Sequence, residues 1–190
     1  MSQACINLSG MTTLVADSDH FTRGITAQIM RGFGAEPCTL VETGKQATQC
    51  LLHNCFDLCI FEAKLTDMFC ADLIRWIRRL KDRTARFTPI LVLSSYTQLQ
   101  YVTEARDAGA NLVARKPTSP QVLFDRVTWI AQASRPFIEI NNYIGPDRRF
   151  KNTEPPDGNF RRETDSDRET EIPPIPEYLA PPIEAASEAM

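Results

Sequence analysis

Short apolar runs alternate with longer stretches of helical periodicity over residues 12–134 of the chain. Five runs are short, apolar and rich in β-branched residues, which is typical of buried strands; they lie at residues 12–16, 38–41, 57–62, 89–95 and 112–114. Between and after these runs, apolar residues recur every three or four positions, which predicts amphipathic helices. The predicted helices begin near His20, Thr43, Phe69, Leu99 and Ser119.

The alternation predicts an α/β protein, with a five-stranded parallel sheet covered by helices on both faces. Nearly continuous apolar strands fit a sheet that is buried on both sides. Asp19, Thr43 and Ser119 stand at N-cap positions, and Gly109 stands where a helix should end. In such a sheet, functional residues gather at the carboxyl ends of the strands.

Polar side chains follow four of the five predicted strands and would meet at that edge of the sheet: Asp17, Ser18, Asp19, Glu62, Ser94 and Lys116. Pro117 follows Lys116 directly. The order and spacing of these residues resemble a response-regulator receiver domain, the phosphoryl-accepting module of two-component signalling. The resemblance covers roughly residues 10–134 and implies the doubly wound, flavodoxin-like receiver fold.

The resemblance implies a role for each position. In a receiver, an acidic pair after the first strand and an aspartate after the third bind Mg²⁺, and that aspartate takes a phosphoryl group from a phosphohistidine. A Ser or Thr after the fourth strand and a Lys after the fifth contact the phosphoryl group, because cations and donors neutralise its charge. Asp17, Ser94 and Lys116 match this pattern.

Three departures alter the site. Ser18 replaces the second acid, Asp19 is acidic but one position later, and Glu62 replaces the acceptor aspartate. The side chain of Glu is one methylene longer, and a misplacement of ~1 Å can lower the rate of an aligned displacement ~100-fold. We therefore expect a pseudo-receiver with weakened Mg²⁺ binding. Asp17 is the one weak candidate ligand, and no metal site or other cofactor is predicted.

Three functions remain open for such a pocket. The carboxylate of Glu62 could imitate an aspartyl phosphate by pairing with Lys116 and drawing in Ser94. The pocket could instead be an inactivated scaffold, or a conventional phosphoacceptor. The favoured hypothesis is a single-domain response regulator, with no enzymatic activity, that binds a protein partner independently of phosphorylation. We expect the partner to bind the face formed by the fourth predicted helix, the fifth predicted strand and the fifth predicted helix.

Composition changes near residue 135. Nine of the thirteen prolines follow it, and seven bases against twelve acids give this region a net charge of −5. We therefore predict a largely disordered tail over residues 135–190, a receiver-like domain over 11–134 and a loose N-terminus over 1–10. The net charge of the chain, −3, makes DNA an unlikely partner.

Other features of the chain indicate its location. The longest apolar runs are too short for a membrane span, and the N-terminus does not resemble a signal peptide. These features predict a cytoplasmic protein. Cys50, Cys55, Cys59 and Cys70 fall in apolar segments without a CxxC pair, so we expect buried free thiols.

The tail carries a repeated Gly-x-x-Arg-Arg element, which ends in Arg148 and Arg149 and again in Arg161 and Arg162. Adjacent guanidinium groups suit bidentate capture of phosphate or carboxylate. The element could therefore bind a protein partner, or could make the protein an effector for a phosphate-bearing ligand such as a cyclic dinucleotide or RNA. Alternatively, these arginines fold back on acidic tail residues or on the receiver surface.

Overall fold

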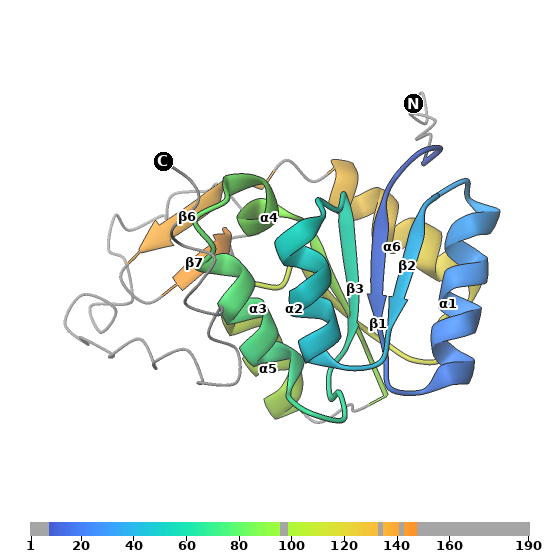
Figure 1. Ribbon diagram of the computed structural model, residues 1–190, viewed down its shortest axis with the longest axis horizontal. Helices are drawn as coiled ribbons and strands as arrows, with labels where there is room; N and C mark the ends of the chain where they lie inside the picture. Colours follow the sequence, from blue (N-terminus) through green and yellow to red (C-terminus); the bar gives the residue numbers. More distant parts are fainter. Residues whose placement is uncertain (1–7, 96–98, 133–134, 141–142, 148–190) are drawn as a thin grey trace, which may run out of the picture.

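The computed structural model describes residues 8–95, 99–132, 135–140 and 143–147. Its centre is a five-stranded parallel sheet in the order β2-β1-β3-β4-β5 (Figure 1). The strands are β1 (Thr13–Ala16), β2 (Cys38–Val41), β3 (Leu58–Glu62), β4 (Ile90–Ser94) and β5 (Leu112–Arg115). The predicted five-stranded parallel sheet is thus confirmed, and its order reverses between β1 and β3.

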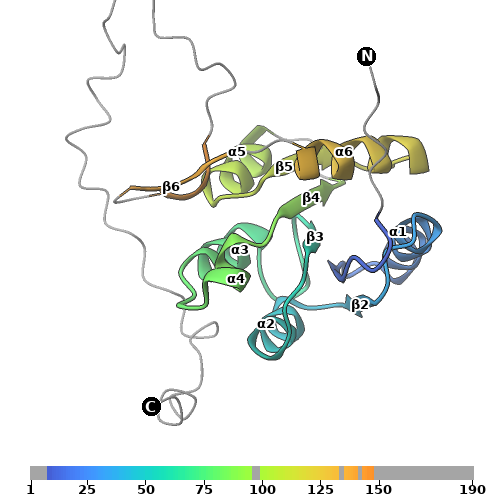
Figure 2. The same ribbon diagram turned by 90° about the horizontal axis from the view of Figure 1, so that it is seen from above.

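Helices cover both faces of the sheet. Figure 2 shows α1 (His20–Gly32) and α6 (Pro120–Gln132) on one side, and α2 (Gly44–His53) and α3 (Cys70–Arg78) on the other. The helix α5 (Leu99–Asp107) contributes Ala105 to the same apolar cluster as α2 and α3. Alternate strand residues enter the two clusters, Leu14 facing α2 and α3 and Val15 facing α1 and α6. The sheet is therefore buried on both faces, as its apolar strands require.

The predicted helix ends are confirmed. The Asp19 carboxylate accepts a hydrogen bond from the backbone N–H of Thr22 at 2.9 Å, at the start of α1. Thr43 forms a full capping box with Gln46 at the start of α2. Gly109, with a φ of +107°, closes the turn after α5 in a conformation that side chains disfavour.

The short helix α4 (Arg83–Phe87) was not predicted. Five residues give too little helical periodicity to be recognised against the polar residues around them. Asp82 caps this helix by accepting a hydrogen bond from the N–H of Thr84 at 2.9 Å. Cys55 is another difference, because it is exposed where the sequence predicted a buried thiol.

The predicted boundary of the folded domain at residue 134 was too early. The strands β6 (Phe137–Ile140) and β7 (Tyr143–Pro146) form an antiparallel hairpin, and β7 packs against α3. The Phe137 ring lies 5.1 Å from that of Phe87 and 5.0 Å from the Arg78 guanidinium. The apolar run Phe137–Ile140 is compatible with an extended segment, but its pairing into a hairpin was not predicted, because tertiary contacts, not local periodicity, stabilise it.

The N-terminal boundary also shifts. Leu8 is 5 % exposed and belongs to the cluster beneath α1 and α6, and the N–H of Gly10 donates to the carbonyl of Gly34. Residues 8–10 are thus part of the fold rather than a loose lead-in. Residues 1–7 and 148–190 lie outside the described residues, so the predictions made for them stay predictions.

Candidate functional site

Three charged side chains converge at the carboxyl edge of the sheet, where its order reverses. Asp17 follows β1, Glu62 ends β3 and Lys116 follows β5. Their side chains are 5 %, 6 % and 10 % exposed. Burial of so much charge requires close pairing, because an unpaired charge in a protein interior is costly.

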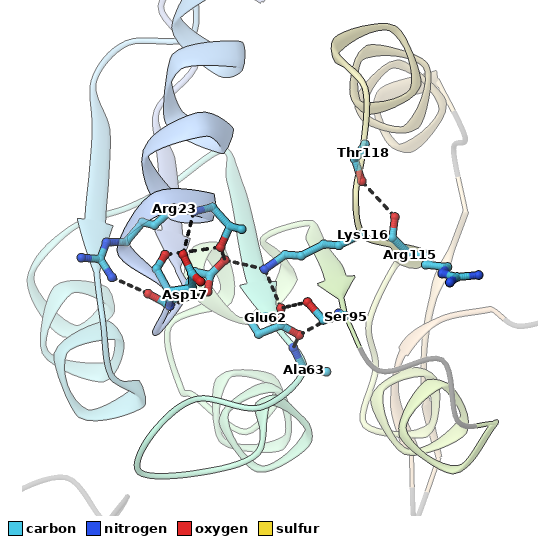
Figure 3. A network of polar contacts seen from close by, with 10 residues as sticks. Asp17, Arg23, Glu62, Ala63, Ser95, Arg115, Lys116 and Thr118 are labelled. Atoms are coloured by element: carbon cyan, nitrogen blue, oxygen red, sulfur yellow. Dashed lines mark hydrogen bonds and ion pairs between the residues drawn. The ribbon is translucent and has the colours of Figure 1, made fainter.

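The Lys116 ammonium group provides this pairing by bridging both carboxylates. Its Nζ lies 2.5 Å from Oδ2 of Asp17 and 2.5 Å from Oε2 of Glu62 (Figure 3). One cation therefore serves two anions, and the three groups together carry a formal charge of −1. The bridge ties the ends of β1, β3 and β5 to one another.

Glu62 makes further contacts on the side away from Asp17. Its Oε1 accepts hydrogen bonds from the backbone N–H of Ala63 at 2.8 Å and of Ser95 at 3.3 Å. Its Oε2 accepts from the Ser95 hydroxyl at 3.3 Å. Each oxygen of Glu62 therefore accepts two hydrogen bonds, counting the one from Lys116.

Ser95 thus has the role that the sequence reasoning gave to Ser94. Ser94 is buried at the end of β4, and its carbonyl accepts a hydrogen bond from the Lys116 N–H at 2.8 Å. The end of β4 decides the difference, because Ser94 is the last residue of the strand and Ser95 lies just beyond it. The residue order alone could not tell which of two adjacent serines reaches the carboxylate.

Asp17 is held from its own side of the site. Its Oδ1 accepts a hydrogen bond from the N–H of Asp19 at 2.9 Å, and its Oδ2 accepts from the Thr22 hydroxyl at 2.8 Å. Asp19 turns away and caps α1, and the hydrogen bond from the Thr22 N–H lowers the pKa of its carboxyl group below the usual value. Ser18 is exposed. The structure therefore brings Asp17, Glu62 and Lys116 together, with Ser18 and Asp19 at the rim.

Arg23 is a site residue that the sequence reasoning missed. It is 6 % exposed, and its guanidinium donates to the backbone carbonyl of Asp17 at 2.5 Å and to the Glu42 carboxylate at 2.7 Å. This clamp holds the β1–α1 turn against the segment after β2. The available signal for a buried role of Arg23 was its place on α1, three and four positions before the buried residues Thr26 and Ala27.

The carboxylates that a divalent cation would bind are already engaged. Mg²⁺ takes six oxygen ligands, usually one or two carboxylates together with several waters. Here both buried carboxylates share Lys116, while the Asp19 carboxylate binds the start of α1. Within the described residues, no group of three His, Cys, Asp or Glu side chains is arranged to hold a metal ion.

The remaining predicted site residues cannot be placed. Arg148, Arg149, Arg161 and Arg162 lie outside the described residues, so a tail site for a phosphate-bearing ligand stays a prediction. In the part of the chain that the structure describes, no helix is both long and apolar enough to cross a membrane.

Comparison with known proteins identifies the domain. The model of the response regulator receiver domain matches residues 13–128, which is more than half of the chain. The chain belongs to this family. A receiver domain of two-component signalling therefore carries the Asp17–Lys116–Glu62 bridge.

Similar proteins agree with this assignment. The chain is 26 % identical over 117 residues to the chemotaxis protein CheY of Pseudomonas aeruginosa, with 62 % of this chain and 93 % of that protein covered. It is 23 % identical over 125 residues to the sensory/regulatory protein RpfC of Xanthomonas campestris; 66 % of this chain and 17 % of that much longer protein are covered.

Solved structures show the same fold. A putative response regulator from Chloroflexus aurantiacus is 27 % identical with a TM-score of 0.59, covering 64 % of this chain and 98 % of its own. The chemotaxis response regulator CheY4 of Vibrio cholerae is 21 % identical with a TM-score of 0.59, covering 64 % and 99 %. Both matches leave about a third of this chain uncovered.

Proposed function

We propose that this receiver acts as a response regulator that binds a protein partner without being phosphorylated and without enzymatic activity of its own. The observation that carries the proposal is the Lys116 bridge. Glu62 shares one buried ammonium group with Asp17, and the proposal assigns Glu62 to the position of the family's acceptor aspartate. The proposal places the protein in the cytoplasm, within a two-component network.

The bridge opposes phosphoryl transfer in two ways. A carboxylate oxygen that attacks phosphorus must be unencumbered and in line, yet both oxygens of Glu62 already accept two hydrogen bonds each. Freeing Oε2 would also separate a buried ion pair, which is unfavourable because the remaining charge is left without a partner. The Mg²⁺ that would neutralise the incoming phosphate lacks a suitable set of ligands.

The same contacts support a permanent active-like state. In the receiver family, a hydroxyl after the fourth strand and the Lys after the fifth contact the phosphoryl group. Glu62 makes both kinds of contact itself, through Ser95 and Lys116. Its fixed negative charge would hold the segment that leads from β4 into α5, and with it the face formed by α5, β5 and α6, in one arrangement.

A phosphodonor experiment tests the first part of the proposal. The full-length protein is incubated with acetyl phosphate and Mg²⁺, and its intact mass is measured. The wild type is expected to remain unmodified. The matched variant S18D/E62D restores both family carboxylates and is expected to gain at least some phosphoprotein. A phosphoryl adduct on the wild type that disappears in E62Q would refute phosphorylation independence.

A binding experiment tests the second part. Partners are captured on wild-type protein, on E62Q and on E36Q, which removes an equal charge from an exposed glutamate outside the site. Loss of a partner with E62Q and its retention with E36Q is expected. If E62Q keeps every partner that the wild type captures, the charge of Glu62 does not set the binding face, and the scaffold alternative is correct.

A further inference from the structure

The α3–α4 segment carries the densest positive charge of the described chain. Residues 75–86 hold six of the fifteen Lys and Arg residues found in residues 1–147, against a single acid. Arg78 is buried, so the exposed or partly exposed members form what we call the α3–α4 basic surface: Arg75, Arg79, Lys81, Arg83 and Arg86.

Several members of this surface contact neighbouring side chains. Arg75 contacts Asp72 at 2.9 Å, and Arg86 contacts Glu139 of the hairpin at 2.5 Å. Lys81 and Arg83 flank Asp82 in the chain, and the Asp82 carboxylate caps α4. Burial, with a smaller contribution from the neighbouring Arg75, lowers the pKa of Arg79 below its usual value. By sequence, the segment therefore carries more cations than acids.

The β6–β7 hairpin brings the C-terminal part of the chain to this surface. Phe137 packs on Phe87 at the end of α4, and Glu139 pairs with Arg86. The N–H of Asp147 donates to the carbonyl of Pro136 at 2.9 Å, which fixes the last described residue at the open end of the hairpin. Figure 1 shows the hairpin next to α4 and α3. The following 43 residues therefore start within a short distance of the α3–α4 basic surface.

The charge of those residues is divided unequally. Residues 148–162 contain five bases and two acids, whereas residues 163–190 contain one base and eight acids. Five of the eight acids fall within Glu163–Glu171, which has a net charge of −4. The fifteen residues between Asp147 and Glu163 span at most ~54 Å when fully extended, which is ample for a return to α4.

We infer that residues 163–171 dock on the α3–α4 basic surface of the same molecule. The opposite charges attract, and tethering by a short linker raises the local concentration of the acidic segment far above that of a separate anionic partner. Docking closes residues 148–162, with their four arginines, into a loop beside the hairpin. An anionic partner of the α3–α4 basic surface must therefore displace this internal competitor.

Zero-length carbodiimide cross-linking of the dilute full-length protein tests the inference. The reagent joins an amine to a carboxylate only when the two are in contact, and Lys81 is an exposed reporter within the α3–α4 basic surface. Peptide mass spectrometry of the monomer is expected to find Lys81 joined to residues 163–171. Lys45, which is exposed on α2, provides the internal reference and should show no preference for these acids.

Charge variants decide whether the surface itself attracts the segment. R79Q/R83Q keeps the Lys81 reporter and is expected to lower its cross-link yield several-fold. R31Q/R126Q removes an equal charge from exposed positions on α1 and α6 and should leave the yield unchanged. Raising the ionic strength from ~0.01 M to ~1 M, which shortens the Debye length from ~30 Å to ~3 Å, should also lower it several-fold.

Three results would overturn the inference. The first is an equal yield in R79Q/R83Q and the wild type. The second is cross-linking of Lys81 to Glu177, Glu184 and Glu188 as often as to residues 163–171. The third is cross-linking found only in dimers, which would place the acidic segment on a second copy.

Discussion

Replacement of Lys116 by methionine should destabilise the fold severely, because it removes the one cation that two buried carboxylates share. Oδ2 of Asp17 and Oε2 of Glu62 each lie 2.5 Å from Nζ, so they cannot be more than about 5 Å apart. Coulomb's law with an effective dielectric constant of ~20 gives roughly 3 kcal/mol of repulsion between unit charges at that separation. Breaking a buried ion pair by removing one partner typically costs ~3–5 kcal/mol. We expect the free energy of unfolding to fall by ~3–5 kcal/mol in K116M.

Urea unfolding followed by far-ultraviolet circular dichroism measures this change. The control K45M removes an exposed lysine from α2 and should change the free energy of unfolding by less than ~0.5 kcal/mol. The double variant K116M/E62Q removes one of the repelling carboxylates, so it should be more stable than K116M alone. A loss below ~1 kcal/mol in K116M, or strict additivity of the two single changes, would show that the bridge does not balance these charges.

Three further predictions concern the parts around the site. In G145A the added Cβ would lie 2.6 Å from the Tyr143 hydroxyl and 2.8 Å from the Cα of Gly109, so thermal unfolding should show a loss of stability of ~1–3 kcal/mol. The control G24A places its Cβ where nothing lies within 4 Å, so it should be neutral or stabilising by up to ~1 kcal/mol. Burial raises the pKa of the Cys59 thiol to about 12 from the usual 9, so the exposed Cys55 should be alkylated before Cys59 at neutral pH. Because the Cys59 thiol ionises at a lower pH in the unfolded chain than in the folded protein, the free energy of unfolding should fall as the pH rises above 9. This fall should be smaller in C59A. T43A removes the capping box of α2 and should cost ~1 kcal/mol in urea unfolding, whereas T43S should cost less.

The elements of the receiver could be predicted from sequence because their signals are local. A helix N-cap such as Asp19 or Thr43 acts on N–H groups two or three residues away, and strand periodicity needs only a few neighbours. The carboxyl ends of parallel strands meet at one edge, so the convergence of Asp17, Glu62 and Lys116 also followed from the strand order.

Residues that depend on side-chain direction were not predictable in the same way. Ser95, rather than Ser94, was the donor found on Glu62, and the choice between them depends on where β4 ends. Arg23 binds the carbonyl of Asp17 and the Glu42 carboxylate 19 positions away, and helical periodicity does not reveal such a contact. The hairpin was missed because its stability comes from contacts with Phe87 and Arg78 rather than from its own residues.

By itself, the sequence determined the alternation of strands and helices, the caps, and the set of polar residues at the strand ends. These follow from interactions between residues close together in the chain. Only the tertiary structure decided that Lys116 bridges Asp17, 99 positions away, to Glu62, and that the chain folds back as a hairpin on α3 and α4. Such contacts depend on how the helices pack on the sheet, because packing fixes distances that no local pattern in the chain encodes.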